Sequence, residues 1–409
     1  MKIPSQQEIK NVPEFKEKIK KSLDKKTTSL LEIVLGGAIS LGASDLHIEP
    51  QKEEAKIRVR IDGILQDVTE VKRKIYEALL SRIKLLSSIK LNVTDRPQNG
   101  RFSVASPKYS IEIRVSTLPA EAGEAVVLRI LNPKNLIGME SLGLRKDLLA
   151  TFKKEIKKPN GMIIVTGPTG SGKTTTLYAF LKAIQRPEIK IITIEDPIEY
   201  HLKGISQTQT NPKKGYNFAS GLKSIMRQDP DVILVGEIRD LETAKIAIQA
   251  ALTGHLVLTT LHTNDAAGTI ARLTSLGAKP SNIGPAINLA IAQRLVRKVC
   301  KKCAELKKPT ASELSKLKKV PGKLPKGIRI PKAKGCKECN YTGYRGRVGI
   351  FEAFSIDDEM EKFILKDPSI AALRKKAIEK GMVLMRQDGF LKVLNKITTI
   401  EEVERITGE

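Results

Sequence analysis

The stretch "GMIIVTGPTGSGKTTTLYAF", residues 161–180, decides the fold because it joins three kinds of local structure in a fixed order. The apolar run 162–165 predicts a short buried strand. A glycine-rich turn follows, and a helical pattern then opens with Lys173 and Thr174. This spacing fits a phosphate-binding loop between a strand and a helix. We therefore predict an α/β domain that carries a phosphate site.

The glycines allow backbone N–H groups to turn inward around phosphate oxygens, and the helix N-terminus adds a favourable dipole. Lys173 is expected to reach the β- and γ-phosphates of ATP, and Thr174 to hold Mg²⁺. The alternative is a glycine-rich turn that arose by chance. Such a turn would not need a strand before it and a helix after it, as this stretch has. The expected nucleotide-binding residues are Gly167, Pro168, Thr169, Gly170, Ser171, Gly172, Lys173, Thr174 and Thr175.

Short apolar runs continue after this loop. They read "IKIITIE" at 189–195, "DVILVGE" at 231–237 and "HLVLTTLH" at 255–262, and helix-start residues follow each one. Buried strands that alternate with helices favour a mostly parallel sheet with helices on both faces. From residue 356 to the end the pattern is helical.

Polar side chains stand where these strands end. Glu237 can reach a metal or orient a water, which favours hydrolysis, although a solvated acid at a plain strand end is the alternative. Glu195 ends another strand, with Asp196 and Glu199 beside it. His262 ends a fourth. A lone histidine is usually structural, but ligands of α/β proteins bind at this edge of the sheet, so we expect a γ-phosphate contact.

The composition limits the choice of partners and compartment. The 409 residues suffice for two or three domains, and the net charge is +26. Such a charge favours polyanions, although lysines scattered over a solvated surface explain it equally well. The start "MKIPSQQEIK" has no apolar core behind it, and the longest apolar stretch contains Glu32. We therefore expect a cytoplasmic protein.

Two chain segments stand apart from the parallel-sheet pattern. Residues 1–28 are polar and charged, which predicts a mobile basic arm or a frayed helix. A small α/β domain of PAS-like type is expected from 29 to 140, with Asp62-Gly63 as a hairpin turn. Its predicted helices and strands are a helix near 29–42, strands at 55–61 and 64–68, a helix near 72–88, and strands "SIEIRVSTL" (110–118) and "EAVVLRIL" (124–131).

The four cysteines form two Cys-x2-Cys pairs, Cys300/Cys303 and Cys336/Cys339. In a reducing compartment this spacing indicates a Zn²⁺ site, and four free thiols are the alternative. The 32-residue loop between the pairs is longer than in the usual zinc ribbon. Residues 301–334 hold 12 Lys/Arg against 2 Glu, with few apolar residues. We therefore expect that this loop cannot fold on hydrophobic burial alone and that the metal holds its ends together.

Several of these segments resemble one known family. "ITIEDPIEY" is similar to its Asp box, "RQDPDVILVGEIRD" to its Walker B segment and "TGHLVLTTLHTNDA" to its His box. "ASDLHIEP", "RIDGIL", "RVSTLP", "GYRGRVGIFE" and "GMVLMRQDGFLKV" match in the same order, so the resemblance covers the chain from about residue 30. The family is that of the secretion ATPases, specifically those of type II secretion and type IV pilus assembly.

The resemblance implies a homohexameric RecA-like ATPase that docks on an inner-membrane platform protein and drives pilin or pseudopilin assembly. It implies that the smaller N-terminal domain supplies arginines to a neighbour's nucleotide, and Arg114 and Arg129 match those positions. A location at the inner face of the cell membrane follows, with an anionic lipid surface as a second partner. Assembly ATPases commonly carry the cysteine pairs. Many have a further N-terminal domain, whereas about 40 residues precede "ASDLHIEP" here.

The expected domains are therefore 1–28, 29–140, and an ATPase domain at 141–409 that includes a zinc insert at 298–345 and terminal helices at 356–409. Three other functions stay open. Retraction ATPases share the chemistry but lack the cysteine pairs. A nucleic-acid translocase of the same superfamily fits the charge, although base-stacking aromatics are few. A non-enzymatic nucleotide switch is the third, and Glu237 argues against it.

Overall fold

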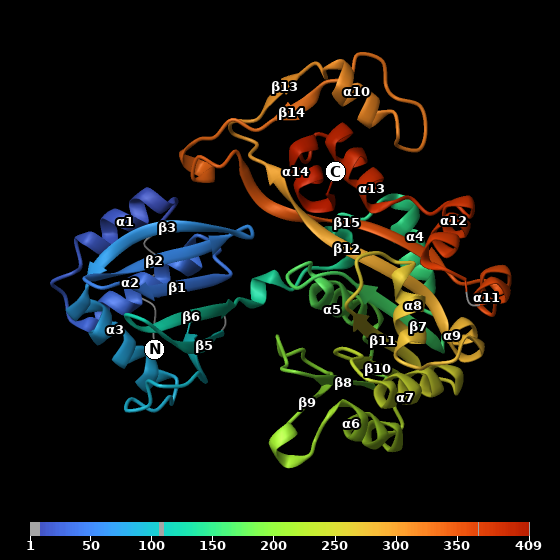
Figure 1. Ribbon diagram of the computed structural model, residues 1–409, viewed down its shortest axis with the longest axis horizontal. Coiled ribbons are helices and arrows are strands. Elements are labelled where there is room, and N and C mark those ends of the chain that lie inside the picture. The colour runs from blue at the N-terminus through green and yellow to red at the C-terminus, as the bar shows by residue number, and fades with distance from the viewer. Residues whose placement is uncertain (1–8, 106–109, 367, 409) are drawn as a thin grey trace. The chain divides into compact units, whose positions relative to one another are not determined.

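The computed structural model describes residues 9–105, 110–366 and 368–408 (Figure 1). The chain divides into two compact units. Unit 1 holds the chain up to Asn135 together with Cys300–Glu305 and Ala333–Gly346. Unit 2 holds Leu136–Val299, Leu306–Lys332 and Arg347–Glu409. The segment expected as a zinc insert, 298–345, is thus shared between both units, and the domain boundaries drawn from the sequence stay a prediction.

Unit 1 is a six-stranded sheet with the strand order β3-β2-β1-β6-β5-β4 and helices on one face. Asp62 and Gly63 both have positive φ, 50° and 85°, as the predicted hairpin turn requires. β1 and β4 are additions to the predicted strands. The elements are α1 (Val12–Lys20), α2 (Thr27–Ser40), β1 (Asp45–Pro50), β2 (Glu54–Ile61), β3 (Ile64–Lys72), α3 (Arg73–Leu86), β4 (Gln98–Ala105), β5 (Ser110–Ala120) and β6 (Gly123–Leu131).

The expected mobile arm over 1–28 is corrected at helix α1. Asn11 caps this helix through its side chain, which accepts from Glu14 N. Phe15 and Ile19 lie four residues apart on one helical face and are completely buried in the core of unit 1. Their burial stabilises a helix that its many charges alone would leave frayed. Residues 1–8 of the expected arm lie outside the described residues.

Unit 2 is built on a seven-stranded sheet with the order β15-β12-β7-β11-β10-β8-β9. β12, β7, β11, β10, β8 and β9 pair in parallel, as predicted for the four apolar runs. The elements are α4 (Lys146–Glu155), β7 (Gly161–Thr166), α5 (Lys173–Ile184), β8 (Ile191–Glu195), β9 (Ser206–Gln209), α6 (Phe218–Ile225), β10 (Val232–Val235), α7 (Leu241–Leu252), β11 (Leu256–Leu261), α8 (Gly268–Ser275), α9 (Pro280–Ala286), β12 (Ile287–Val299), β13 (Glu305–Lys307), α10 (Ala311–Leu317), β14 (Ile330–Lys332), β15 (Tyr344–Ser355), α11 (Asp358–Ile364), α12 (Ile370–Glu379), α13 (Met385–Leu394) and α14 (Ile400–Thr407).

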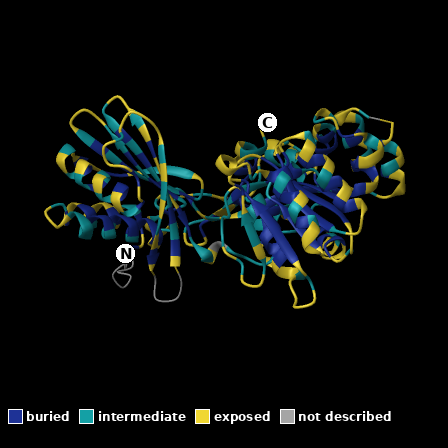
Figure 2. Ribbon diagram, turned by 90° about the horizontal axis from the view of Figure 1, so that it is seen from below, coloured by how far each residue is buried: buried dark blue, intermediate teal, exposed yellow. Residues whose placement is uncertain are grey.

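Both faces of this sheet are covered, so the central strands are buried throughout (Figure 2). α4 and α5 pack on one face, through Phe152 and Phe180 among others. Helices α6, α7, α8 and α9 pack on the other face around Met162 and Ile164. Burial on both faces explains why β7, β10 and β11 read as continuous apolar runs. Because these strands are parallel, their carboxyl ends lie at one edge of the sheet.

The long loop between the cysteine pairs shares a hydrophobic core with α13 and α14, so it buries more apolar surface than its composition suggests, while the role of metal at its ends stays a prediction. Leu317, Val320 and Ile330 are buried against Phe390 and other apolar residues of α13 and α14. These few apolar side chains are hidden in the sequence among many lysines, and their partners lie about 70 residues away. No helix among the described residues is long and apolar enough to cross a membrane.

Candidate nucleotide site

The phosphate-binding loop joins β7 to α5, as the sequence predicts. Gly167, Gly170 and Gly172 have φ of 144°, 77° and 89°, which favours glycine at each position. A Cβ on Gly167 would lie 2.4 Å from the Gln293 carbonyl oxygen, so a side chain there has no room. A Cβ on Gly170 would meet nothing within 4 Å. The loop is therefore closed against the protein and open on its outer side.

Lys173 folds back over this loop. Its Nζ donates to the Gly167 carbonyl at 2.8 Å and to the Pro168 carbonyl at 3.3 Å. Burial lowers the pKa of Lys173, and the negative charge of Glu237 opposes this shift. The Ser171 hydroxyl is buried without a hydrogen-bond partner. A partly buried cation and an unsatisfied buried hydroxyl in a glycine-rich loop fit an anionic, oxygen-rich ligand such as a nucleotide phosphate.

Glu237 and His262 come together at the carboxyl edge of the sheet, after β10 and β11. His262 Nε2 lies 3.4 Å from Glu237 Oε2, and Arg239 pairs with the other carboxylate oxygen. Burial, followed by the positive charge of Lys173, lowers the pKa of His262, and Glu237 opposes the shift. We call Lys173, Glu237, Arg239 and His262 the nucleotide cluster.

Glu195 has a different environment. It is 4 % exposed, and its carboxylate accepts hydrogen bonds from the hydroxyl groups of Tyr178 and Thr193 and from Gln207 Nε2. Burial, with the Glu195 charge next, raises the pKa of Tyr178. Because both Glu195 oxygens already accept hydrogen bonds, this carboxylate is less available to orient a water than that of Glu237.

Gln293 is a site residue that sequence reasoning missed. Its side chain is 1 % exposed and lies on β12, beside the phosphate-binding loop. It accepts from the Thr176 hydroxyl at 2.6 Å and donates to the Ser171 carbonyl at 2.9 Å. The residue therefore fixes the loop to the start of α5. No motif marks it, because its partners are more than 100 residues away in the chain.

In unit 1, the two predicted arginines lie directly opposite each other on β5 and β6. The register extends across three further strands, β4, β1 and β2, so that side chains opposite each other share one face. We call this set the arginine row: Arg101, Arg114, Arg129 and Arg60, with Asp45 between the last two.

The row lies on the sheet face away from the buried core of unit 1. Arg129 Nε donates to Asp45 Oδ1 at 3.0 Å and is 55 % exposed. Arg114 Nε donates to Glu112 at 3.2 Å. The row holds more guanidinium groups than carboxylates, which suits it to phosphate oxygens. Sequence reasoning found two of its arginines but missed Arg60 and Arg101.

The four cysteines gather in unit 1. Their Sγ atoms all lie within 4.8 Å of one another, with Cys300–Cys336 at 3.9 Å and Cys336–Cys339 at 3.8 Å. Four sulfurs about 2.3 Å from one tetrahedral Zn²⁺ would stand about 3.8 Å apart. Backbone N–H groups of Gly335 and Gly343 donate to these sulfurs. The donor set therefore fits zinc.

The cysteine cluster contacts two other parts of unit 1. Asn340, which follows Cys339 at a positive φ of 51°, accepts from the Val12 N–H at 2.7 Å. This contact satisfies a free N–H at the start of α1. Asp62 of the β2–β3 turn accepts from the Gly346 N–H at 2.6 Å. The cluster thus holds both the first helix and a hairpin turn.

A lysine-bearing loop after a buried strand, with a carboxylate and a histidine on neighbouring parallel strands, defines a RecA-like P-loop nucleotide-binding fold. Comparison with known families agrees. Residues 21–405 match the family described as "Type II/IV secretion system protein". Because this match covers nearly the whole chain, the chain belongs to that family.

Relatives with known names are similar over most of the chain. The type II secretion system protein E of Pseudomonas aeruginosa is 44% identical over 97% of this chain and 79% of its own length. The type IV pilus assembly ATPase PilB of Thermus thermophilus is 42% identical over 95% of this chain and 45% of its own. A crystal structure of the pilus retraction motor PilT with bound ADP matches with a TM-score of 0.62 and 27% identity, over 92% of this chain and 96% of that one.

Proposed function

We propose that this protein is an ATP hydrolase that converts hydrolysis into mechanical work for type IV pilus assembly or type II secretion. The observation that carries the proposal is the nucleotide cluster, in which Glu237 and His262 stand at the sheet edge beside Lys173. The named relatives are type II secretion E proteins and type IV pilus assembly ATPases, which supports this class of work.

In the proposed site, the loop from Gly167 to Thr175 binds the phosphates through backbone N–H groups, and Lys173 moves from its carbonyl partners to the β- and γ-phosphates. The Thr174 hydroxyl would hold Mg²⁺, which would neutralise phosphate charge. Glu237 accepts a hydrogen bond from the attacking water and orients it. His262, which lies beside Glu237 at this edge, donates to a γ-phosphate oxygen. Glu195 holds the strand end in place.

The arginine row acts on the nucleotide of a neighbouring subunit in this proposal. Arg129 is 55 % exposed, and the row holds several guanidinium groups on one sheet face, so it can offer hydrogen-bond donors to a phosphate from outside unit 1. Arg114 and Arg129 would neutralise phosphate charge when subunits close, which requires a ring, and we propose a homohexamer. The ring works in the cytoplasm on an inner-membrane platform protein, with anionic lipid as a second contact.

The four cysteines would hold one structural Zn²⁺, since their sulfur spacing fits a tetrahedral site. This site also bears on the direction of the motor, because the cysteine pairs are expected in assembly ATPases and not in retraction ATPases. Retraction is the second candidate, on the similarity to PilT. The assembly proteins are more similar in sequence, so assembly is preferred.

The test combines two substitutions in unit 2. Glu237→Gln should keep ATP binding and lose at least about 10²-fold in turnover, because the water loses its acceptor. Lys173→Ala should weaken both binding and turnover. Binding is measured by calorimetry and turnover by phosphate release. Near-normal turnover in Glu237→Gln would remove this residue from the chemistry and favour Glu195. Stimulation of hydrolysis by DNA, and not by a platform protein, would favour the translocase.

A further inference from the structure

Residues 306–332 form an excursion from the main sheet, with its own secondary structure. β13 and β14 pair as a two-stranded sheet, and α10 lies between them in the chain (Figure 1). Thr310 caps α10 in a capping box with Glu313. On its inner side the excursion packs on α13 and α14 through Leu317 and Ile330. This packing leaves the other side of α10 free to face a second surface.

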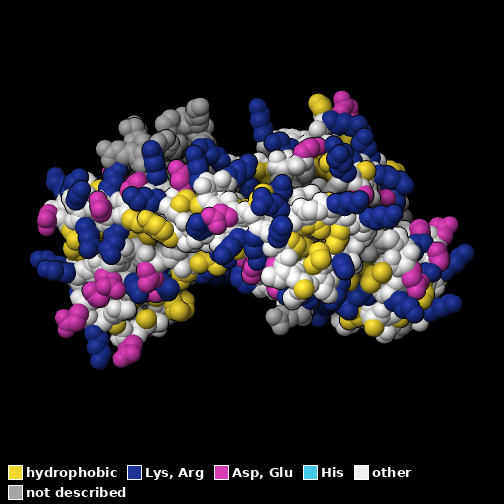
Figure 3. Space-filling view, turned by 90° about the horizontal axis from the view of Figure 1, so that it is seen from above, with side chains coloured by type: hydrophobic (Ala, Val, Ile, Leu, Met, Phe, Trp, Pro, Cys, Tyr) yellow, Lys and Arg dark blue, Asp and Glu magenta, His cyan; other side chains and the backbone are white. Residues whose placement is uncertain are grey.

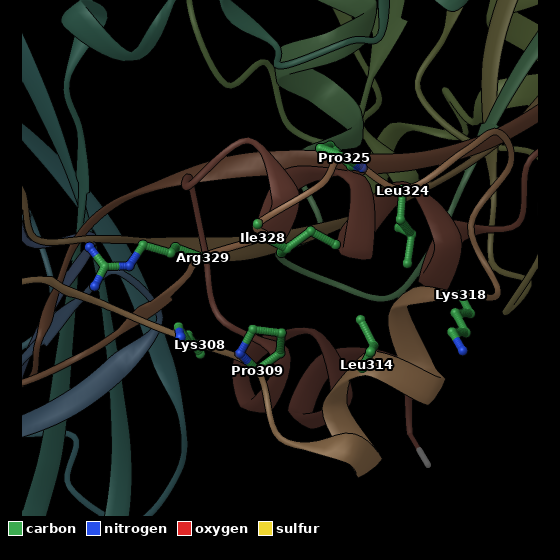
Figure 4. A pocket seen from close by; sticks show the side chains of 9 residues that line it. Lys308, Pro309, Leu314, Lys318, Leu324, Pro325, Ile328 and Arg329 are labelled. Carbon is green, nitrogen blue, oxygen red and sulfur yellow. The ribbon is translucent and has the colours of Figure 1, made fainter.

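A groove opens between α10 and the loop 324–329, with a volume of about 490 Å³. Pro309 and Leu314 point across it toward Leu324 and Ile328 (Figure 4). These side chains are only partly buried, so the groove exposes apolar surface. Its volume lies within the range of about 300–1,000 Å³ that is usual for ligand pockets. Leu324 and Ile328 also pack at the edge of the inner core described above, so they form the floor of the groove, while Pro309 and Leu314 line its other side.

The charges around the groove have one sign. Lys318 lies at one end, and Lys308 and Arg329 lie toward the other (Figure 4). None of the three pairs with an acid among the described residues. The single acid of the excursion, Glu313, is bound to Lys307 at 2.6 Å. An apolar floor with unpaired cations at both ends is complementary to an apolar segment with a carboxylate at each end.

This arrangement distinguishes among the anionic partners that the net charge alone leaves open, which are nucleic acid, an anionic lipid surface and an acidic protein. On the face that Figure 3 shows, lysines and arginines are scattered among acids and other side chains. An anionic lipid carries its charge at one end of an acyl chain, so it would leave the cations at the other end unpaired. Nucleic acid binds through aromatic stacking and a cationic track. No aromatic side chain lines the groove, and its floor is apolar.

We propose that this groove binds an acidic amphipathic segment of a partner protein, which seats two or three apolar side chains between Leu314 and Ile328 and places carboxylates near Lys318 and Arg329. A groove with an apolar floor and cations at both ends suits an acidic helix or strand. It does not involve the nucleotide cluster, so it stands or fails separately from ATP hydrolysis.

The test measures binding of the full-length protein to a fluorescein-labelled twelve-residue peptide of glutamates flanking four leucines, by fluorescence anisotropy. A peptide with glutamine in place of glutamate and phosphatidylglycerol vesicles are the comparison ligands. Saturable binding of the acidic peptide is expected. Leu314→Asp, and separately the pair Lys318→Glu and Arg329→Glu, should weaken it at least about tenfold, as loss of a central contact does. The control Lys245→Glu, an exposed charge on α7, should change it less than about twofold.

A photoreactive leucine analogue in the same peptide should attach to residues of α10 or of 324–329. The charge variant changes only exposed side chains, and its ATP hydrolysis, measured in parallel, reports whether it is folded. Absence of saturable peptide binding would overturn the proposal, as would equal binding by the parent and both variants. If the glutamine peptide bound as tightly as the glutamate peptide, the proposed pairing of carboxylates with the cations of the groove would be wrong. Vesicle binding that the variants lose, without peptide binding, would assign the groove to the membrane.

Discussion

The nucleotide cluster of unit 2 and the arginine row of unit 1 differ in how their charges are balanced. In the cluster, Glu237 already has His262 and Arg239 as partners. In the row, Arg60 and Arg129 both lie beside Asp45, and Arg114 pairs with Glu112. The cluster gathers its partners on one carboxylate at the strand ends, whereas the row presents several guanidinium groups along one sheet face, which suits it to phosphate oxygens. Under the proposed function, unit 2 therefore binds the nucleotide and the row of unit 1 responds to it.

The largest expected difference between the two units is how strongly the folded structure of each depends on the metal. Removal of Zn²⁺, by chelation or by Cys336→Ser with Cys339→Ser, should expose unit 1 at α1 and at the cysteine segments, because structural zinc contributes roughly 10–16 kcal/mol of apparent binding in peptides. Hydrogen exchange should accelerate at the Val12 N–H, which Asn340 holds. Exchange in β7, β10 and β11 of unit 2 should stay slow.

Metal analysis of protein purified without chelator should give one zinc per chain. Zinc added back should restore slow exchange to the chelated parent and not to the serine variant. If α1 exchanged at the same rate with and without the metal, the coupling between zinc and the first helix would be wrong.

The arginine row should have the next largest effect. Arg114→Ala with Arg129→Ala should lower turnover by about 10³-fold or more, the magnitude of arginine fingers, and leave ATP binding to unit 2 nearly unchanged. Lys74→Ala, which removes an exposed charge on α3, is the control.

Mixing the arginine variant with Glu237→Gln should recover part of the hydrolysis, because one subunit then supplies the intact row and its neighbour the intact cluster. Light scattering should confirm that the mixed rings assemble. If no mixture then hydrolyses ATP faster than the sum of the two variants measured alone, the arginines have a structural and not a catalytic role.

Gln293→Ala should act within unit 2 and by less. The change leaves the buried Thr176 hydroxyl and Ser171 carbonyl without their partner, so the free energy of unfolding should fall by about 1–3 kcal/mol. Urea unfolding followed by circular dichroism measures this, with the exposed Gln249→Ala as the control. Equal stability of both variants would show that the bridge between loop and helix is dispensable.

The smallest effect concerns pH. Because the folded protein lowers the pKa of His262 below its ordinary value of 6.5, the unfolded chain binds the proton more readily. The stability tied to neutral His262 is therefore fully present above about pH 6.5 and decreases as the pH falls through that value. His262→Gln should flatten this part of the profile of unfolding free energy against pH. An unchanged slope below 6.5 would contradict the shift.

The sequence predicts unit 2 more fully than unit 1 for a physical reason. A phosphate loop and the acids at strand ends depend on residues that are neighbours in the chain, and parallel pairing then gathers the strand ends at one edge. Gln293 and the row members Arg60 and Arg101 depend on strand register over long separations, which no local pattern records. The core of 306–332 was missed because its partners lie on α13 and α14.

The division of unit 1 into three chain segments has a consequence for its synthesis. The unit is completed only when Gly346 has left the ribosome, whereas its first segment ends at Asn135. At about 5–20 residues per second, the intervening stretch of roughly 210 residues takes about 10–40 s. During that interval the nascent helix α1 lacks its contact with Asn340. This contact can form only after the second pair of cysteines has been synthesised, because Asn340 follows Cys339. With zinc bound as proposed, its capture would be a late step in the maturation of each new chain, and a cell short of zinc would accumulate chains with a finished phosphate loop and an open first unit.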